Sequence, residues 1–259
     1  MMMATLLLGF GFALVCGTAF CAERASQPSL QSPRERAERV FKEAETHFKN
    51  NPTNFTAAWQ FARACFDLAE LAAKDTERAE LAQRGIAVCR QLIGRDPKNA
   101  AAHYYLALNL GQLARTKSLG ALKLLSEMER EAKTALDLDP SFDYAGPDRF
   151  LGMLYHEAPG WPASIGSKSK ARAHLLKAVE RSPDYPENRL YLLEAYWQWG
   201  EKNKVQAELN ATGKIMEKAH KKFVGVEWAD SWRDWEKRWE TIKRKAATSS
   251  VPNAKQGSQ

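Results

Sequence analysis

Residues 151–183 read LGMLYHEAPGWPASIGSKSKARAHLLKAVERSP, and this stretch determines the fold that we predict. It begins with the pattern LGxxY at 151–155 and continues with AxxxLxxA at 171–178, so small and bulky residues recur at helical spacing. Proline cannot continue a helix, so Pro183 marks the end of the second periodic run. The stretch therefore predicts two helices joined by a loop, with Ser167 as the N-cap of the second helix.

Prolines divide the rest of the chain at regular intervals. Each follows a residue that it biases away from helical conformation, so each marks the end of a helix. The four dipeptides are spaced by 45, 43 and 43 residues: Asn51-Pro52, Asp96-Pro97, Asp139-Pro140 and Ser182-Pro183. A fixed period of this length is typical of a helical repeat protein.

Small-to-bulky motifs recur in every period, and the pattern resembles the tetratricopeptide repeat. The motifs are Phe61-Ala62-x-x-Cys65, Leu106-Ala107-x-x-Leu110, Leu151-Gly152-x-x-Tyr155 and Leu192-Leu193-x-x-Tyr196. The resemblance implies an all-α array of about four helix pairs at 34–222, with a leading helix at 34–49. The period exceeds the usual 34 residues, so long insertions are expected between the helices of each pair. No stretch alternates as a strand would, so we expect no sheet.

Four tryptophans follow the array. Trp228, Trp232, Trp235 and Trp239 are spaced by 4, 3 and 4 residues, so they share one face of a helix. We predict a Trp-rich helix at 223–245 that caps the last repeat, with a partner-binding surface as the alternative. The polar segment 246–259 predicts a disordered tail.

The N-terminal segment is apolar. Residues 4–22 carry no charge, so we predict a signal peptide at 1–22, a linker at 23–33 and export to the periplasm or cell envelope. Neither Cys16 nor Cys21 follows a small residue as a lipid anchor requires, and an uncleaved anchor is the alternative. In an oxidising compartment Cys65 and Cys89 form either a disulfide or two buried thiols.

The charge favours some partners over others. The chain carries a net +7, of which +5 lies in the last 60 residues, and this could favour an anionic membrane surface or an acidic partner. Nucleic acid is not expected, because no zinc-finger spacing or RNA-recognition signature is present.

Enzyme signatures are absent from the sequence. The segment 160–169 comes near a phosphate loop, but its spacing has one residue too many on both sides of Gly166. No HExxH pair or GxSxG elbow occurs. We therefore expect no catalytic residue, no cofactor and no metal.

The loop at 158–167 is open to two interpretations. In one, Trp161 and Ile165 are buried as a structural plug between repeats. In the other, the loop is the lip of a ligand pocket with Tyr155 and His156 at its mouth. The full set of candidate ligand- or partner-binding residues is Tyr155, His156, Pro159, Trp161, Ile165, Trp59, His103 and Arg189.

The same loop carries a more specific resemblance. Residues 152–166 read GxxYxxAPGWPxSIG, and with KAxxxLxxAV at 170–179 and PDYPEN at 183–188 they look like the T-component family of tripartite ATP-independent periplasmic (TRAP) transporters. The resemblance implies a non-enzymatic accessory subunit of solute uptake that binds a periplasmic substrate-binding subunit. It also implies a homo-oligomer and a small apolar ligand. The alternative is a general cell-envelope scaffold for protein assembly with no small-molecule ligand.

Overall fold

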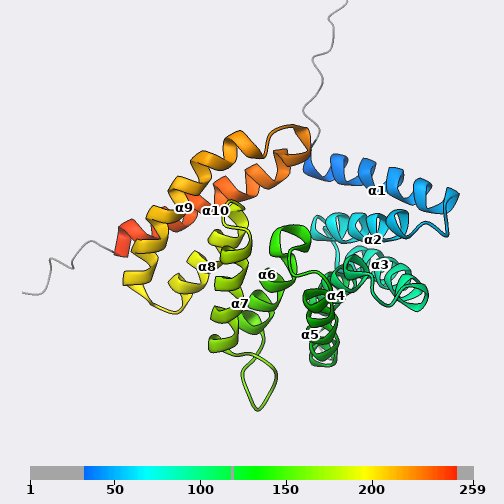
Figure 1. The fold of residues 1–259 in the computed structure, drawn as a ribbon, viewed down its shortest axis with the longest axis horizontal. Coiled ribbons are helices and arrows are strands. Elements are labelled where there is room, and N and C mark those ends of the chain that lie inside the picture. The colour runs from blue at the N-terminus through cyan, green and yellow to red at the C-terminus, as the bar shows by residue number, and fades with distance from the viewer. Residues whose placement is uncertain (1–31, 118–119, 250–259) are drawn as a thin grey trace, which may run out of the picture. The chain divides into compact units, whose positions relative to one another are not determined.

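The computed structural model describes residues 32–117 and 120–249 of the chain. Figure 1 shows the helices, whose bounds are α1 (Pro33–Asn50), α2 (Phe55–Glu70), α3 (Asp75–Arg95), α4 (Ala100–Arg115), α5 (Ala121–Leu138), α6 (Phe142–Glu157), α7 (Lys168–Arg181), α8 (Pro186–Gln198), α9 (Lys202–Lys222), the 3-10 turn η1 (Val226–Trp228) and α10 (Ala229–Ser249). The predicted signal peptide, the linker up to residue 31 and the tail from residue 250 lie outside the described residues.

The helices after α1 are stacked in pairs. Each helix from α1 to α9 packs on the next along the chain, and α2 also contacts α4, α4 contacts α6, and α6 contacts α8. The first helices of successive pairs are therefore neighbours, as in a tetratricopeptide array. Within residues 32–117 and 120–249 there is no strand, and one isolated bridge joins Gly160 to Gly166. The predicted all-α repeat fold is confirmed.

The prolines end helices as the sequence predicts. Each lies two residues beyond the last residue of α1, α3, α5 or α7: Pro52, Pro97, Pro140 and Pro183. N-caps support the other ends, because Asn54, Asn99 and Ser167 each accept a hydrogen bond from the backbone N–H three residues ahead. The long period is accommodated by long second helices, such as the 21-residue α3, and by the loop between α6 and α7.

Small residues allow the two helices of a pair to approach closely. A Cβ atom on Gly152 of α6 would lie 2.7 Å from the Leu175 side chain of α7. Ala171 and Ala178 on the facing helix are completely buried. The small-to-bulky motif is therefore a packing motif of the helix pair.

The start of α6 contains an irregularity that the sequence does not reveal. Asp143, Tyr144 and Ala145 have φ of 49°, 55° and 62°, so three consecutive non-glycine residues are left-handed. Such a conformation costs roughly 1–2 kcal/mol per residue. The Arg149 side chain donates to the carbonyls of Asp143 and Tyr144, each at 3.2 Å, and the Asn188 amide donates to the Tyr144 carbonyl at 3.0 Å. These contacts offset the strain.

The Trp-rich C-terminal helix caps the array. Trp235 is 1% exposed and packs beside the rings of Tyr185 and Phe223. The other three tryptophans of the stripe are partly buried against the same part of the core. Capping by this helix is confirmed, but its predicted bounds are not. α10 begins at Ala229, so Trp228 lies in η1 before it, and α10 runs to Ser249, so residues 246–249 are helical where the sequence predicted a tail.

The first and last helices are also linked. The guanidinium of Arg36 in α1 donates to Asp230 in α10, with Nε 2.9 Å from Oδ2. This bidentate ion pair joins residues 194 positions apart in the chain. The repeat pattern of the sequence does not predict that Arg36 and Asp230 form an ion pair.

None of the helices in the described ranges combines the length and the apolar character needed to cross a bilayer.

Cys65 and Cys89 are both free thiols that are fully buried. Burial raises the pKa of Cys65 to about 12, and burial likewise raises the pKa of Cys89. Because the thiolate is the reactive form, we expect neither thiol to react with a disulfide reagent at pH 8 in the native chain. Both should react within seconds once urea unfolds the protein, and a colorimetric thiol assay on the Cys16→Ser, Cys21→Ser variant measures this. Fast labelling of either thiol in the native chain would show that the core around α2 and α3 opens.

Candidate functional site

The first helices of the four pairs, α2, α4, α6 and α8, share a polar face. We call it the first-helix face and define it by Trp59, Arg63, Asp67, Glu70, Arg115, Glu157, Glu187, Tyr191 and Glu194. Contacts join these residues across the pairs: Arg115 Nη1 donates to Glu70 at 3.1 Å. The face as defined carries five acidic and two basic residues. The face is therefore acidic on a chain whose overall charge is +7.

An aromatic cluster supports one end of this face. The rings of Trp59 and Tyr105 stack with their centroids 5.8 Å apart, and Phe142 meets both edge-on. Tyr104 packs against Tyr105 and Phe142 in the same cluster. Rings from α2, α4 and α6 are thereby locked together, which fixes the relative positions of the first three pairs.

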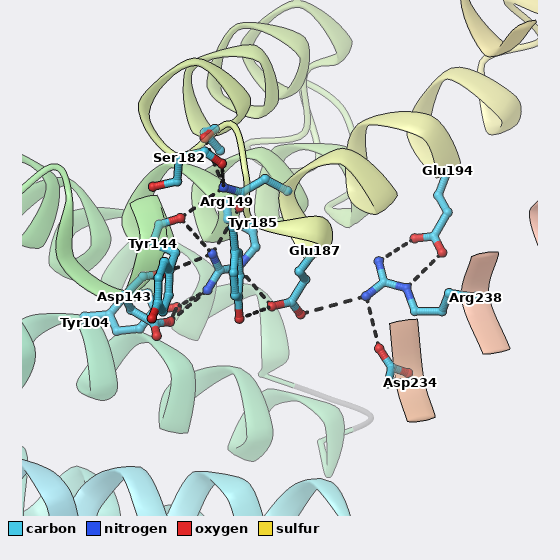
Figure 2. A network of polar contacts seen from close by, with 12 residues as sticks. Tyr104, Asp143, Tyr144, Arg149, Ser182, Tyr185, Glu187, Glu194, Asp234 and Arg238 are labelled. Atoms are coloured by element: carbon cyan, nitrogen blue, oxygen red, sulfur yellow. Dashed lines mark hydrogen bonds and ion pairs between the residues drawn. The ribbon is translucent and has the colours of Figure 1, made fainter. Parts of the chain in front are cut away.

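A buried arginine connects α4, α6 and α8 (Figure 2). Arg149 Nη2 lies 2.7 Å from Asp143 Oδ2, and Nη1 lies 3.1 Å from Asn188 Oδ1. Glu187 Oε2 lies 3.6 Å from Nε, and the Tyr104 hydroxyl donates to Asp143 at 2.9 Å. Burial alone would lower the pKa of Arg149, but its anionic neighbours hold that pKa well above the usual value. The side chain therefore remains charged, and both of its Nη atoms donate hydrogen bonds.

A second arginine extends the network to the capping helix (Figure 2). Arg238 of α10 binds both oxygens of Glu194 at 2.9 and 2.8 Å, and it lies 3.2 Å from Asp234 and 3.8 Å from Glu187. Its guanidinium also lies over the ring of Tyr191 at 4.0 Å. The carboxylates of α8 are thus held at fixed positions by the cap.

Some carboxyl groups of the first-helix face lack a close cationic partner among the residues that the structure describes. Asp67 keeps 44% of its side chain exposed, and its contact with Arg63 is 3.5 Å long. Desolvation by the surrounding protein raises the pKa of Asp67 to about 6, and Asp143 and Glu70 add to the rise. Desolvation also raises the pKa of Glu157, although its side chain is exposed. Both carboxyl groups are accessible to a cationic group from outside the chain.

The sequence-predicted residues beside the loop do not converge on one pocket. Tyr155 is 2% exposed, and its hydroxyl donates to Glu129 of α5 at 2.6 Å. His156 is partly buried, and its Nε2 lies 2.7 Å from the Gln198 side-chain oxygen of α8. The two side chains therefore contact different neighbours, and each connects α6 to another pair.

The plug interpretation of the loop is wrong for Trp161. Its side chain is 88% exposed, whereas Ile165 is partly buried against the core between α4 and α6. Pro159 is exposed, and its carbonyl accepts the Gly166 N–H at 2.9 Å. A Cβ on Gly166 would lie 2.0 Å from the Ala158 carbonyl oxygen, so glycine is needed for this approach. The ends of the loop close on themselves, which leaves Trp161 facing solvent.

The other predicted residues lie elsewhere in the array. Trp59 belongs to the first-helix face, as described above. Arg189 Nη1 lies 2.7 Å from Glu208 and joins α8 to α9. His103 is 7% exposed, with Nδ1 2.6 Å from Glu131 of α5 and Nε2 3.0 Å from the Pro97 carbonyl. The last two are contacts between neighbouring helices.

The His103–Glu131 pair predicts a pH dependence of stability. The hydrogen bond with Glu131 raises the pKa of His103 above 6.5, so the folded chain holds this proton more tightly than the unfolded chain. The resulting stabilisation is complete below about pH 6.5 and is lost as the pH rises through the folded pKa. We expect the free energy of unfolding in urea to fall from pH 6.5 to 8.5, and the fall to be smaller in His103→Gln.

His174 provides the internal control for that measurement. Burial, followed by the charges of Lys177, Lys133 and Lys170, lowers the pKa of His174 to about 4. The unfolded chain still binds a proton at this imidazole near pH 6.5, so the His174 contribution makes stability rise with pH, opposite in sign to the His103 contribution. It is the same in the wild type and in His103→Gln. An unchanged pH slope in His103→Gln would contradict the assignment.

In the segment 160–169, which resembles a phosphate loop, backbone N–H groups donate to carbonyls of the chain and not toward a phosphate site. The Gly166 N–H donates to Pro159 and the Ser167 N–H donates to the Tyr155 carbonyl at 2.9 Å. Lys168 lies 2.9 Å from Glu201. Among the described residues no three His, Cys, Asp or Glu side chains are grouped to hold a metal. Surface recesses at 200–204 and between α1, α2 and α3 are lined by none of the predicted residues.

Sequence reasoning missed the charged residues of the first-helix face. Arg63 and Asp67 stand four residues apart, the spacing of an ion pair on one helix face. Arg149 and Asn188 are 39 residues apart, which is near one repeat period. Both signals are visible in the sequence once the first helix of each pair has been assigned.

These features define a helical repeat protein with a tetratricopeptide-like fold. Residues 23–145 match a family model described as regulator of microtubule dynamics protein 1-3, which covers less than half of the chain. No curated protein matches the sequence. The fold is similar to that of a thermophilic TPR protein from Thermus thermophilus, at 20% identity over 81% of this chain and 91% of that one, with a TM-score of 0.60. It is also similar to MamA, at 14% identity over 74% and 98%, with a TM-score of 0.50.

Proposed function

We propose that this chain is a non-enzymatic scaffold that binds a protein partner on the first-helix face, and that the partner segment is basic. The observation that carries the proposal is the acidic excess of this face, including accessible Asp67 and Glu157, on a basic chain. A partner lysine or arginine beside these groups would pair with carboxylates that the face's own arginines match only in part. The tetratricopeptide-like fold supports a role in protein binding.

The test is a quantitative pull-down from the native source with the full chain as bait. Asp67→Asn combined with Glu70→Gln should lower the recovery of the partner about tenfold or more, because two accessible acids are lost. The matched control is Asp75→Asn with Glu80→Gln on α3, which removes one aspartate and one glutamate from a second helix. Equal recovery with both baits, or loss with the control alone, would contradict the proposal.

The pH dependence of the affinity for the recovered partner provides a second test. Asp67 has a pKa of about 6, so it gains its charge between about pH 5 and pH 7. Affinity for a basic segment should rise over this interval in the wild-type chain and rise less in Asp67→Asn. An affinity that falls as the pH rises would exclude a cationic partner group beside Asp67.

A more specific role remains a second candidate. The segment 152–188 resembles the TRAP T-component family, so we propose export to the periplasm and an accessory role in solute uptake, as a homo-oligomer with a small apolar ligand. Recovery of a TRAP substrate-binding subunit in the pull-down would support this role. Recovery of envelope assembly factors instead would favour a general scaffold without a small-molecule ligand.

A further inference from the structure

The loop between α6 and α7 displays a single tryptophan to solvent. Two hydrogen bonds close its ends, from Gly166 to Pro159 and from Ser167 to Tyr155, and Ile165 packs inward. Figure 1 shows the loop extending beyond the helices that it joins. An indole that is 88% exposed gives up the burial that a tryptophan normally gains in a fold. Exposure on a closed loop therefore suggests a contact outside the chain.

Lysines occupy the start of α7, directly after the loop, and the start of α9. We define the Trp161 surface as Trp161 together with Lys168, Lys170, Lys202 and Lys204, all of which are exposed. The two second helices from which the lysines come, α7 and α9, carry eleven basic and three acidic residues. This surface therefore has a charge opposite to that of the first-helix face.

Contacts place two of these lysines, Lys168 and Lys204, together. Glu201, in the turn between α8 and α9, lies 2.9 Å from Lys168 and 3.0 Å from Lys204, and it also pairs with Arg172. One carboxylate thus faces three cations, and a positive charge remains. The low pKa of His174, about 4, has burial as its main cause, and nearby lysines of α5 and α7 lower it further.

We propose that the Trp161 surface docks onto an anionic membrane. Tryptophan is favoured at the membrane–water interface, where its ring is partly buried and its N–H stays hydrated. Lysines beside it would be attracted to acidic lipid headgroups. A protein partner would be expected to bury a larger apolar patch, whereas one indole on an extended loop suits a lipid interface. The Trp161 surface is separate from the first-helix face.

A dye placed on the loop tests the proposal in the full chain. In a Cys16→Ser, Cys21→Ser background, Ala163→Cys puts an exposed thiol two residues from Trp161, and the buried Cys65 and Cys89 should remain unlabelled. With an environment-sensitive fluorophore at residue 163, vesicles containing phosphatidylglycerol should cause a blue shift, and pure phosphatidylcholine vesicles should not. The same dye at Lys98→Cys, in the turn between α3 and α4, should not respond.

Substitutions measure the two contributions. Each lysine near an acidic surface contributes about a fivefold factor in binding, so Lys168→Gln with Lys170→Gln should weaken vesicle binding about 25-fold. Trp161→Ala should weaken it about tenfold with an unchanged circular dichroism spectrum. The control pair Lys42→Gln and Lys98→Gln removes two exposed lysines elsewhere and should have no effect.

Three results would overturn the proposal. The first is no dye response at residue 163 with anionic vesicles. The second is an equal response at residues 163 and 98. The third is a response to polyglutamate but not to vesicles, which would indicate an acidic protein partner. Asp67→Asn with Glu70→Gln should leave the vesicle response intact, so failure of the partner-binding proposal is separable from failure of this one.

Discussion

Arg149→Ala lowers the free energy of unfolding by about 3–5 kcal/mol, because it removes one partner of a buried charge network and leaves the other groups unpaired. The loss includes the two hydrogen bonds that hold the carbonyls of Asp143 and Tyr144 in the left-handed turn. The melting temperature should fall by about 10 °C. Chemical denaturation followed by circular dichroism measures the change.

Arg63→Ala is the matched control for this substitution. Arg63 also lies on a first helix and also faces an aspartate, but its side chain is 54% exposed. Exposed pairs contribute about 0–1 kcal/mol, so this variant should be nearly as stable as the wild type. Equal stability losses in the two variants would show that the Arg149 network does not hold α4, α6 and α8 together.

Trp235→Ala should cost about 3–5 kcal/mol, the loss typical of a large aromatic side chain removed from a core. Trp235 is 1% exposed and fills the space between α8, α9 and α10 beside Tyr185 and Phe223. Its removal leaves a cavity under the capping helix. The same denaturation experiment measures the change.

Trp161→Ala is the control for Trp235→Ala, because it removes the same side chain from an exposed position. We expect a change within about 0.5 kcal/mol, as is usual for surface substitutions. A large loss of unfolding free energy in Trp161→Ala with a small loss in Trp235→Ala would contradict both assignments. It would indicate that Trp161 is a buried structural plug and that Trp235 does not hold the capping helix. The pair therefore tests both assignments of the tryptophans.

The sequence was sufficient to predict the repeat, because prolines and small residues act locally. Pro97 follows the end of α3, and Gly152 allows close contact with Leu175 of the paired helix. The cap was predictable as well, since four tryptophans on one helix face need a covering surface. Both signals depend on helical spacing alone.

The loop and the left-handed turn could not be predicted in the same way. Trp161 and Ile165 are both apolar, and the sequence does not indicate which of them points inward. Asp143, Tyr144 and Ala145 include no glycine, so their positive φ values depend on distant contacts from Arg149 and Asn188. Tertiary contacts determine the orientation of Trp161 and the left-handed turn at 143–145. The spacing of residues in one sequence does not reveal those contacts.

Site-specific photo-crosslinking tests the central claim, that a partner binds the first-helix face. A benzophenone amino acid replaces Arg63 of α2 in one variant and Arg90 of α3 in the other. Both arginines are about half exposed, at 54% and 56%, and both face a carboxylate. We predict a crosslinked partner from position 63 and none from position 90. A crosslink from position 90 with none from position 63 would contradict the account.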